Sequence, residues 1–204
     1  MAATRDRIVT ATAELFRRQG YNGTALKAVT VAADAPFGSL YHFFPGGKEE
    51  LGEAVVLTSG RAYQELFEVI YDAAPDPVTA VGDFFDGAAE VLVSTGYVDA
   101  CPIGTVALEV ASTNDRLRRA TATVFAGWEA AAATRLAGAG IAPAAAAELA
   151  TTLVAAIEGG FMLSRAARSP DPMHTAGRAM RRLVAAALTE AAAEADVEPS
   201  DVSG

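Results

Sequence analysis

The segment that decides the fold is residues 24–51, which read TALKAVTVAADAPFGSLYHFFPGGKEEL. Apolar residues recur at helical spacing in its first ten positions, which predicts a short helix ending at Ala33, with Thr24 as its N-terminal cap. A tight turn follows, and because proline is tolerated in the first turn of a helix, a second short helix is expected from Pro36 to Phe43. The segment therefore predicts two short helices joined by a tight turn.

A longer helix precedes this pair. Apolar residues at helical spacing predict it from Thr4 to Gly20; they are Ile8, Ala11, Leu15 and Phe16. Two short helices after a longer first one make a helix-turn-helix, in which the second short helix can enter the DNA major groove while the first braces it across the backbone. The N-terminal part of the chain is therefore a candidate DNA-binding module.

Composition extends the helical prediction to the whole chain. Alanine, the best helix former, supplies 47 of the 204 residues, and 51% hydrophobic residues are ample for a packed core. We predict an all-α protein of about nine helices, with an irregular connector over residues 96–104. The six helices after the first three are expected at 48–72, 76–95, 105–111, 114–137, 143–167 and 173–195.

Cysteine usage and hydropathy exclude several classes of protein. The single cysteine, Cys101, permits neither an intramolecular disulfide framework nor a paired-cysteine metal clamp. The N-terminus lacks the apolar segment of a signal peptide, and charged residues interrupt the alanine-rich stretches before about 20 apolar residues accumulate. We therefore expect a soluble cytoplasmic protein with no membrane partner.

The net charge of −9 argues, as a single number, against a nucleic-acid partner. Its distribution argues the opposite, because residues 1–48 carry six basic and three acidic side chains while residues 49–204 carry 10 basic and 22 acidic ones. A basic N-terminal part on an acidic body is typical of a polyanion-binding module joined to a soluble domain. The alternative is that the net charge of +3 on residues 1–48 arises by chance. Sequence motifs are therefore needed to choose between the two interpretations.

Residues 32–51 supply such a motif, because they resemble the N-terminal DNA-binding domain of the TetR family of repressors. In that family the turn and recognition helix commonly read Gly-Val-Ser-x-Gly-Ser-Leu-Tyr-x-His/Tyr-Phe, followed by Lys-Glu-x-Leu. Here residues 38–44 read GSLYHFF and residues 48–51 read KEEL. The resemblance covers about 45 residues, and it implies a double-stranded DNA operator as the partner.

The resemblance also implies a role for individual residues. Tyr41, His42 and Lys48 would hold phosphates, which fixes register rather than sequence. Thr24 would present a hydroxyl or amide to a phosphate at its helix start, while Lys27 and Ser39 would read bases. The full set implied for DNA contact is Thr24, Lys27, Pro36, Phe37, Gly38, Ser39, Tyr41, His42 and Lys48. Taken without the motif, Tyr41 could equally be a core aromatic and His42 a solvated surface histidine.

Three departures from the family pattern fall in the turn and at the start of the recognition helix. In one of them Ala35-Pro36 replaces Val-Ser, which removes a hydroxyl that could contact phosphate. Asp34 replaces the usual turn glycine, and aspartate tolerates the left-handed conformation that such a turn requires. Phe37 occupies a position that is often lysine or another polar residue. It could pack on a thymine methyl group, or turn inward and read nothing.

The rest of the chain resembles the branch of that family that contains lincomycin-resistance and flavonoid-responsive repressors, through residues 101–109 (CPIGTVALE) and 158–170 (EGGFMLSRAARSP). The resemblance implies a helical effector-binding and dimerisation domain, whose last two helices pack against their symmetry mates as a four-helix bundle. We accordingly expect a DNA-binding domain at 1–47, an effector and dimerisation domain at 48–195, and a flexible acidic tail at 196–204. Gly159 and Gly160 inside one helix suggest a close approach by another helix or a ligand.

An effector pocket would be lined by apolar and aromatic side chains with few polar ones. The candidates are Tyr63, Phe67, Phe85, Leu92, Cys101, Ile103, Leu108, Phe125, Trp128, Glu158, Phe161 and Met162. Each of these aromatics could instead be ordinary core. Cys101 could be a redox sensor, although a buried, inert thiol is favoured because nothing basic lies near it in the sequence.

The resulting hypothesis is a homodimeric transcriptional repressor that a small apolar or aromatic effector releases from a palindromic operator, with no cofactor and no metal. An enzyme is disfavoured, because His42 and His174 are far apart in the sequence and no Ser–His–Asp pattern or phosphate-binding glycine loop is present. Glu109 and Glu158 could face one cavity, but as a polar rim. A helical adaptor that binds only protein is the third possibility.

Overall fold

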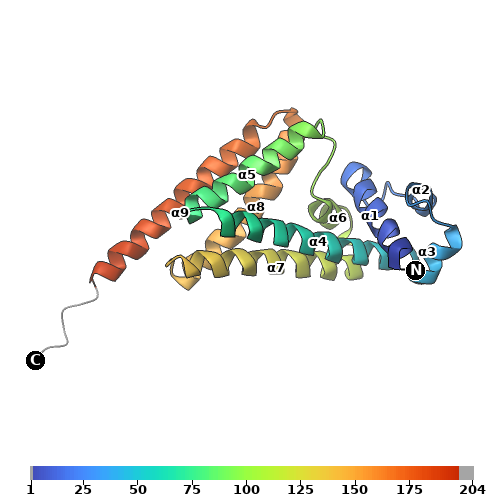
Figure 1. Cartoon of the computed structure of the whole chain (residues 1–204), viewed down its shortest axis with the longest axis horizontal. Helices are drawn as coiled ribbons and strands as arrows, with labels where there is room; N and C mark the ends of the chain where they lie inside the picture. Colours follow the sequence, from blue (N-terminus) through green and yellow to red (C-terminus); the bar gives the residue numbers. More distant parts are fainter. Residues whose placement is uncertain (1, 198–204) are drawn as a thin grey trace, which may run out of the picture. The chain divides into compact units, whose positions relative to one another are not determined.

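The computed structural model describes residues 2–197, and within them it contains nine α-helices and no strand (Figure 1). The predicted all-α fold is confirmed. The helices are α1 (Ala2–Gln19), α2 (Leu26–Ala32), α3 (Phe37–Phe43), α4 (Gly47–Ala73), α5 (Pro77–Ser94), α6 (Pro102–Val110), α7 (Asp115–Gly138), α8 (Pro143–Ala167) and α9 (Asp171–Val197). Residues 196 and 197 of the predicted tail belong to α9, and residues 198–204 lie outside the described part.

The chain divides into two compact units, and each combines two separate stretches of sequence. The first unit combines Met1–Glu65 with Ser94–Ala126, and the second combines Leu66–Val93 with Gly127–Gly204. The first unit therefore includes α6 and parts of α4 and α7 together with the three N-terminal helices. The second unit holds most of α5 and all of α8 and α9.

Two predicted helix starts are wrong because the capping groups differ. The N-cap of α2 is Ala25, and Thr24 instead donates its hydroxyl to the Gly20 carbonyl at 2.7 Å in the preceding turn. The helix predicted from Thr105 begins at Pro102, since proline suits the first turn and the Cys101 sulfur accepts the Gly104 N–H at 3.4 Å. The last residues of the predicted connector are therefore helical. At the N-terminus, α1 already includes Thr4.

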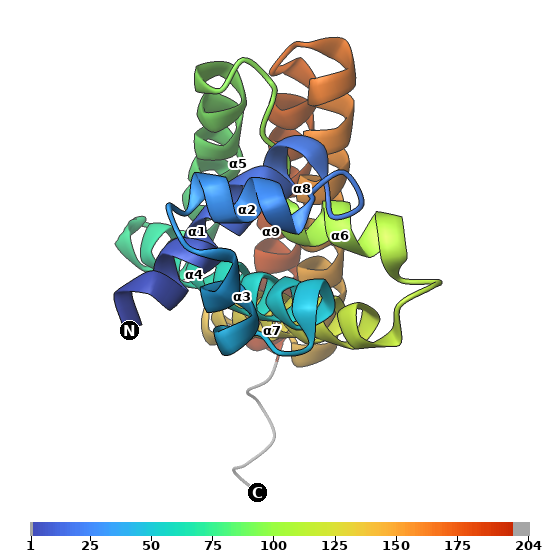
Figure 2. The same ribbon diagram turned by 90° about the vertical axis from the view of Figure 1, so that its right-hand side faces the viewer.

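In the first unit, α1 lies against α2, α3 and α6 (Figure 2). Its side chains Ile8 and Phe16 are fully buried, as are Leu40 of α3 and Phe44 just after it. These apolar contacts fix the short helices onto the longer one. Helices of seven residues are too short to be stable alone, so packing on α1 is what holds α2 and α3 in place.

Glycines permit close helix packing in the second unit. A Cβ at Gly160 of α8 would lie 2.7 Å from the sulfur of Met173 in α9, and a Cβ at Gly177 of α9 would lie 2.7 Å from the Cβ of Phe85 in α5. The predicted close approach at the glycine pair is confirmed for Gly160. Gly159 differs, because a Cβ there would meet nothing within 4 Å in the described chain.

Among the described helices, α8 alone is long and apolar enough to cross a membrane by length and composition, and a third of its most apolar window is buried. Core helices of soluble proteins pass the same test. The helix packs along α9 and carries Glu148 and Glu158. Most of its apolar window is therefore left uncovered within one chain.

The glycine contacts predict opposite effects of two alanine substitutions in the second unit. Gly177→Ala should lower the free energy of unfolding by about 1–2 kcal/mol, because the added methyl group overlaps the rigid Cβ of buried Phe85. Gly87→Ala on α5 is the matched control, since its Cβ meets nothing within 4 Å in the described chain and alanine favours the helix by up to about 1 kcal/mol. Urea unfolding at one fixed protein concentration measures both; equal effects would contradict the prediction.

Candidate nucleic-acid interface

The turn between α2 and α3 has the backbone conformation expected from the sequence. Asp34 adopts a left-handed conformation with φ of 45°, as predicted for the residue in the place of the usual glycine. The Ala35 N–H donates to the Thr30 carbonyl at 3.0 Å and closes the turn. Pro36 is the N-cap of α3, so the second short helix begins at Phe37.

The guanidinium of Arg7 on α1 binds two carbonyl groups of this turn. Arg7 Nε donates to the Ala33 carbonyl at 3.0 Å, and an Nη of the same side chain donates to the Asp34 carbonyl at 3.1 Å. Carbonyls at a helix C-terminus lack intrahelical partners, so a fixed cation beside them satisfies both hydrogen bonding and the helix dipole. No local motif in the sequence distinguishes Arg7 from Arg5, so this role of Arg7 is visible only in the structure.

The α3 helix separates an anchored face from an exposed one. Leu40 is fully buried, whereas Phe37 and Tyr41 are 48% and 46% exposed. Their rings lie 5.5 Å apart at 54°, so the two aromatics support each other on the outer surface. The alternative that Tyr41 is a core aromatic is therefore wrong, and so is the alternative that Phe37 turns inward.

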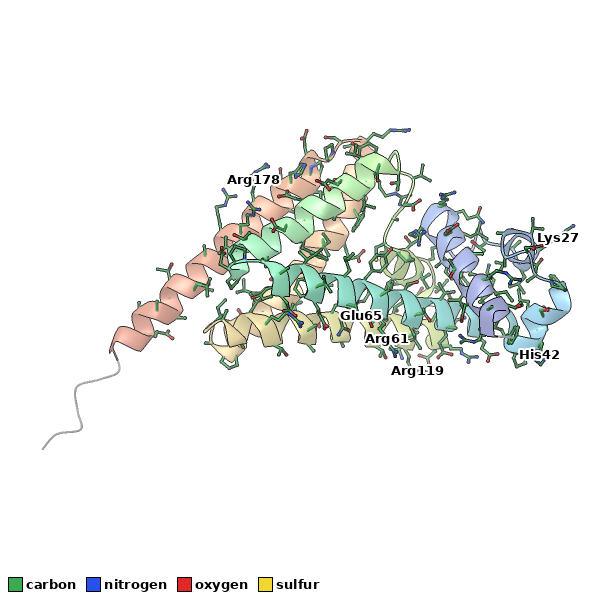
Figure 3. The ribbon with its side chains drawn as sticks, in the orientation of Figure 1. Lys27, His42, Arg61, Glu65, Arg119 and Arg178 are labelled. Atoms are coloured by element: carbon green, nitrogen blue, oxygen red, sulfur yellow. The ribbon has the colours of Figure 1, made fainter. Side chains whose placement is uncertain are left out.

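The other predicted DNA-contacting residues divide into three groups. Lys27 on α2 and His42 on α3 are exposed and project outward (Figure 3), and Pro36 and Gly38 are exposed between them in the sequence. Ser39 is half-buried. Thr24 is 1% exposed and its hydroxyl is bound to Gly20, so the structure places it beneath the surface rather than at a phosphate position.

Lys48 lies at the start of α4, as predicted, but against an aromatic ring. Its Nζ is 4.4 Å from the centroid of the buried Tyr21 ring, a cation–π contact. Burial lowers the pKa of the Lys48 ammonium from its ordinary value, while Glu109 acts in the opposite direction. The side chain is half-buried, so its reach toward a phosphate is restricted by this contact.

Two carboxylates from the α5–α6 region bind the N-terminal helices within the first unit. Asp99 pairs with Arg17 at 3.1 Å and Arg18 at 3.4 Å, at the end of α1. Glu109 of α6 accepts the N–H of Asn22 at 2.7 Å, in the turn before α2. Glu109, considered above as a polar group of a cavity rim, is thus a brace for the helix-turn-helix.

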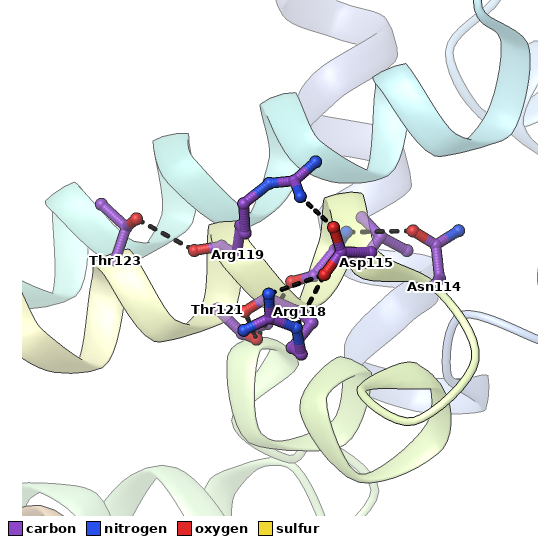
Figure 4. Close-up of polar contacts among 7 residues, drawn as sticks. Asn114, Asp115, Arg118, Arg119, Thr121 and Thr123 are labelled. Atoms are coloured by element: carbon purple, nitrogen blue, oxygen red, sulfur yellow. Dashed lines mark hydrogen bonds and ion pairs between the residues drawn. The ribbon is translucent and has the colours of Figure 1, made fainter.

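Arg118 and Arg119 at the start of α7 share the carboxylate of Asp115 (Figure 4). Asp115 accepts from Arg118 at 2.6 Å and also pairs with Arg119, and Arg116 binds Glu53 of α4 at 2.6 Å. The Arg118 hydrogen bond holds the pKa of the Asp115 carboxyl below its usual range. These three arginines are therefore paired with carboxylates, whereas Lys27 is exposed on α2.

The candidate pocket residues fall into both units. In the first unit Cys101 and Ile103 are buried and Tyr63 and Phe125 are half-buried, but Leu108 is 82% exposed. Burial raises the pKa of the Tyr63 hydroxyl, and Arg17 opposes the shift. Leu108 does not occupy the position of a lining residue.

In the second unit, Phe67, Phe85 and Leu92 are buried and Trp128, Glu158 and Phe161 are half-buried, but Met162 is 60% exposed. Met162 is thus as unsuited to lining a pocket as Leu108. The Phe67 ring contacts Tyr71 at 5.8 Å and Phe84 at 5.1 Å, centroid to centroid. The Tyr71 hydroxyl is buried and has no hydrogen-bond partner within residues 2–197. The sequence analysis does not include Tyr71 or Phe84 among the pocket candidates. A sequence does not show which aromatic rings meet, or that a buried hydroxyl lacks a hydrogen-bond partner.

Comparisons with known proteins identify the family. Residues 8–55 match the family model described as bacterial regulatory proteins of the tetR family, and residues 77–179 match the C-terminal domain of LmrA/YxaF-like transcriptional regulators. The chain belongs to the TetR family of transcriptional regulators. The TetR resemblance and its LmrA/YxaF-like branch are both confirmed, and members of this family are regulators rather than enzymes.

Relatives that are HTH-type transcriptional regulators cover most of the chain. The HTH-type regulator YxaF of Bacillus subtilis is 36% identical over 83% of this chain and 89% of its own length. An HTH-type regulator of Mycobacterium tuberculosis strain H37Rv is 33% identical over 93% and 98%, and LmrA of Bacillus subtilis is 31% identical over 83% and 90%.

Solved TetR-type structures show the same fold. The regulatory protein TetR from Rhodobacter sphaeroides superposes with a TM-score of 0.77 at 23% identity, covering 87% of this chain and 97% of that one. A TetR regulator from Chloroflexus aurantiacus gives 0.74 at 28% identity, with 89% and 94% covered. TetR regulators bind DNA operators and small-molecule effectors and act as dimers.

The brace on the turn predicts that Arg7→Gln destabilises the helix-turn-helix. The free energy of unfolding should fall by about 1–2 kcal/mol, because two carbonyls lose a charged donor at a partly exposed site. Hydrogen exchange at the Ala35 N–H should accelerate, since that bond closes the same turn. Arg61→Gln, an exposed change on α4 (Figure 3), is the control. Unchanged exchange at Ala35 in Arg7→Gln would contradict the assignment.

Proposed function

We propose that the protein is a homodimeric cytoplasmic repressor whose two α3 helices enter successive major grooves of a pseudo-palindromic operator, about 34–36 Å apart. The observation that carries this proposal is the exposed surface of Lys27, Phe37, Tyr41 and His42 on a helix-turn-helix anchored by buried Leu40. The N-terminal domain of residues 1–47 supplies this surface. The acidic remainder, with a net charge of −12 over residues 49–204, would repel DNA and restrict contact to the α2–α3 face.

Dimerisation through α8 and α9 is supported by what those helices leave uncovered. The apolar α8 buries only a third of its most apolar window within one chain. Met162 and Leu163 of α8 and Leu183 of α9 are 60%, 57% and 46% exposed. Large apolar side chains gathered on two adjacent helices are typical of an interface, and a second copy would cover them.

For the effector, the aromatic cluster of the second unit is the favoured site. Phe67, Tyr71 and Phe84 form a continuous set of ring contacts, and Phe85 extends it. The buried Tyr71 hydroxyl lacks a partner in the described chain, so a ligand with one polar group among aromatic atoms would supply it. A small apolar or aromatic molecule fits this chemistry.

Release from DNA would proceed through the braces of the first unit. Asp99 and Glu109 hold the end of α1 and the Asn22 turn from the α5–α6 region. An effector that stabilises a different position of α6 would draw these contacts away from the DNA-competent arrangement. The effector must then bind the released state more tightly, by about 1.4 kcal/mol for each tenfold change in operator affinity.

The DNA-binding proposal predicts a salt-dependent affinity for duplex DNA from upstream of the protein's own gene. The logarithm of the association constant should fall linearly with the logarithm of salt concentration, because phosphate contacts release counterions. We propose that exposed Lys27 contacts a phosphate rather than the base that the resemblance implies, so Lys27→Gln should reduce the magnitude of that slope by about 1. Tyr41→Ala should weaken binding, and fluorescence anisotropy measures both effects. Arg178→Gln on α9 (Figure 3) is the control. A protein-only adaptor would bind no such duplex, and the variants would behave like the wild type.

The effector proposal predicts that some aromatic metabolite or antibiotic in a thermal-shift screen raises the melting temperature and dissociates the protein–DNA complex. Tyr71→Phe should abolish most of the shift for a polar aromatic hit, because the ligand loses its hydroxyl partner. The variant itself should be at least as stable as the wild type, since it removes an unsatisfied buried hydroxyl. A full ligand shift in Tyr71→Phe would place the effector elsewhere.

A further inference from the structure

The recognition helix has an unusual side-chain composition for reading bases. Residues 37–43 read FGSLYHF and contain no Arg, Lys, Asn, Gln, Asp or Glu. Bidentate recognition of guanine uses Arg or Lys, bidentate recognition of adenine uses Asn or Gln, and acceptance from cytosine uses Asp or Glu. The α3 helix therefore lacks the side chains for these pairings, and Ser39, which could contact several bases, is half-buried.

Phe37 occupies the position on α3 from which a base edge is reached. It is the first residue of the helix, and the N-terminal residues of a recognition helix are those that contact bases. Its side chain is half exposed and supported from one side by the Tyr41 ring at 5.5 Å. A Cβ at the adjacent Gly38 would meet nothing within 4 Å in the described chain, so the surface beside Phe37 is open to an approaching duplex.

The apolar group that the major groove offers to such a side chain is the 5-methyl of thymine. We propose that Phe37, held by Tyr41, reads thymine in each operator half-site by packing on that methyl group. This inference rests on the proposed DNA-binding function and adds the base preference of its recognition helix. Removing one buried methyl should lower affinity about fourfold per half-site, which corresponds to about 0.8 kcal/mol.

The test begins with a duplex that the full-length wild-type protein selects from a random DNA pool. Each thymine of that duplex is then replaced by deoxyuridine, singly and in symmetric pairs, which removes the methyl group and leaves base pairing unchanged. For the wild-type protein, affinity should fall about fourfold for one substituted half-site and about sixteenfold for both, at one or two positions only. Substitution at the remaining thymines should have no effect.

Variants of Phe37 connect the effect to the side chain. Phe37→Ala should bind the thymine duplex more weakly and should not distinguish it from the uracil duplex. Phe37→Leu keeps an apolar side chain and should retain part of the difference. Lys27→Gln is the matched control on α2, because it should weaken binding to both duplexes equally. Circular dichroism and melting temperature check that each variant is folded, as expected for a half-exposed position.

Two results would overturn the proposal while leaving DNA binding intact: equal wild-type affinity for every uracil-substituted duplex, or a Phe37→Ala protein that keeps the full uracil effect. Where Phe37→Ala binds too weakly for a titration, selection by that variant from the same pool gives the answer. The thymine should then be lost from the selected sites, and its persistence would also overturn the proposal. If the wild-type protein selects no duplex, the proposed function itself fails, and the thymine assignment fails with it.

Discussion

The helix-turn-helix depends on its packing against α1, to which Arg7 adds a pair of hydrogen bonds to the Ala33 and Asp34 carbonyls. Two seven-residue helices have little stability of their own, and the turn between them contains a non-glycine residue in the left-handed region. A cation fixed on α1 offsets both costs by satisfying the carbonyls that the turn leaves exposed. The orientation of α3, and with it the placement of Phe37 and Tyr41, follows from that contact and from buried Leu40.

Local sequence patterns predict where the helices lie. Hydrogen bonds and packing determine the exact helix starts and the roles of individual side chains. The bounds of α8 match the prediction at both ends, because Pro143 suits a first turn and Arg168 ends the helix in the left-handed region. The sequence predicts Thr24 as a helix cap, since threonine commonly caps helices, and the family resemblance implies a phosphate contact for it. In the structure its hydroxyl donates to the Gly20 carbonyl, one turn back. The spacing of residues in the sequence does not distinguish this bond from a cap.

The exposed recognition surface was predictable in part. The motif placed Lys27, Phe37, Tyr41 and His42 on α2 and α3, and the structure exposes all four. The net positive charge of residues 1–48 says less about DNA binding. Arg7 is bound to backbone carbonyls, and Arg17 and Arg18 are bound to Asp99 within the first unit. Such pairings join residues more than 25 positions apart in the sequence, so composition alone counts these cations as available.

The first unit is built from two separate stretches of sequence, and this affects the design of chimeric regulators. Gly20 has φ of 74°, and a Cβ there would overlap the Glu109 carboxylate, so the residue is fixed by its own backbone and by a partner far along the chain. Transplanting residues 1–47 onto the body of a relative would leave Asp99 and Glu109 behind. A chimera that keeps the contacts of Asp99 and Glu109 must include Ser94–Ala126 together with the N-terminal helices. The transferable DNA-binding unit is therefore discontinuous in sequence.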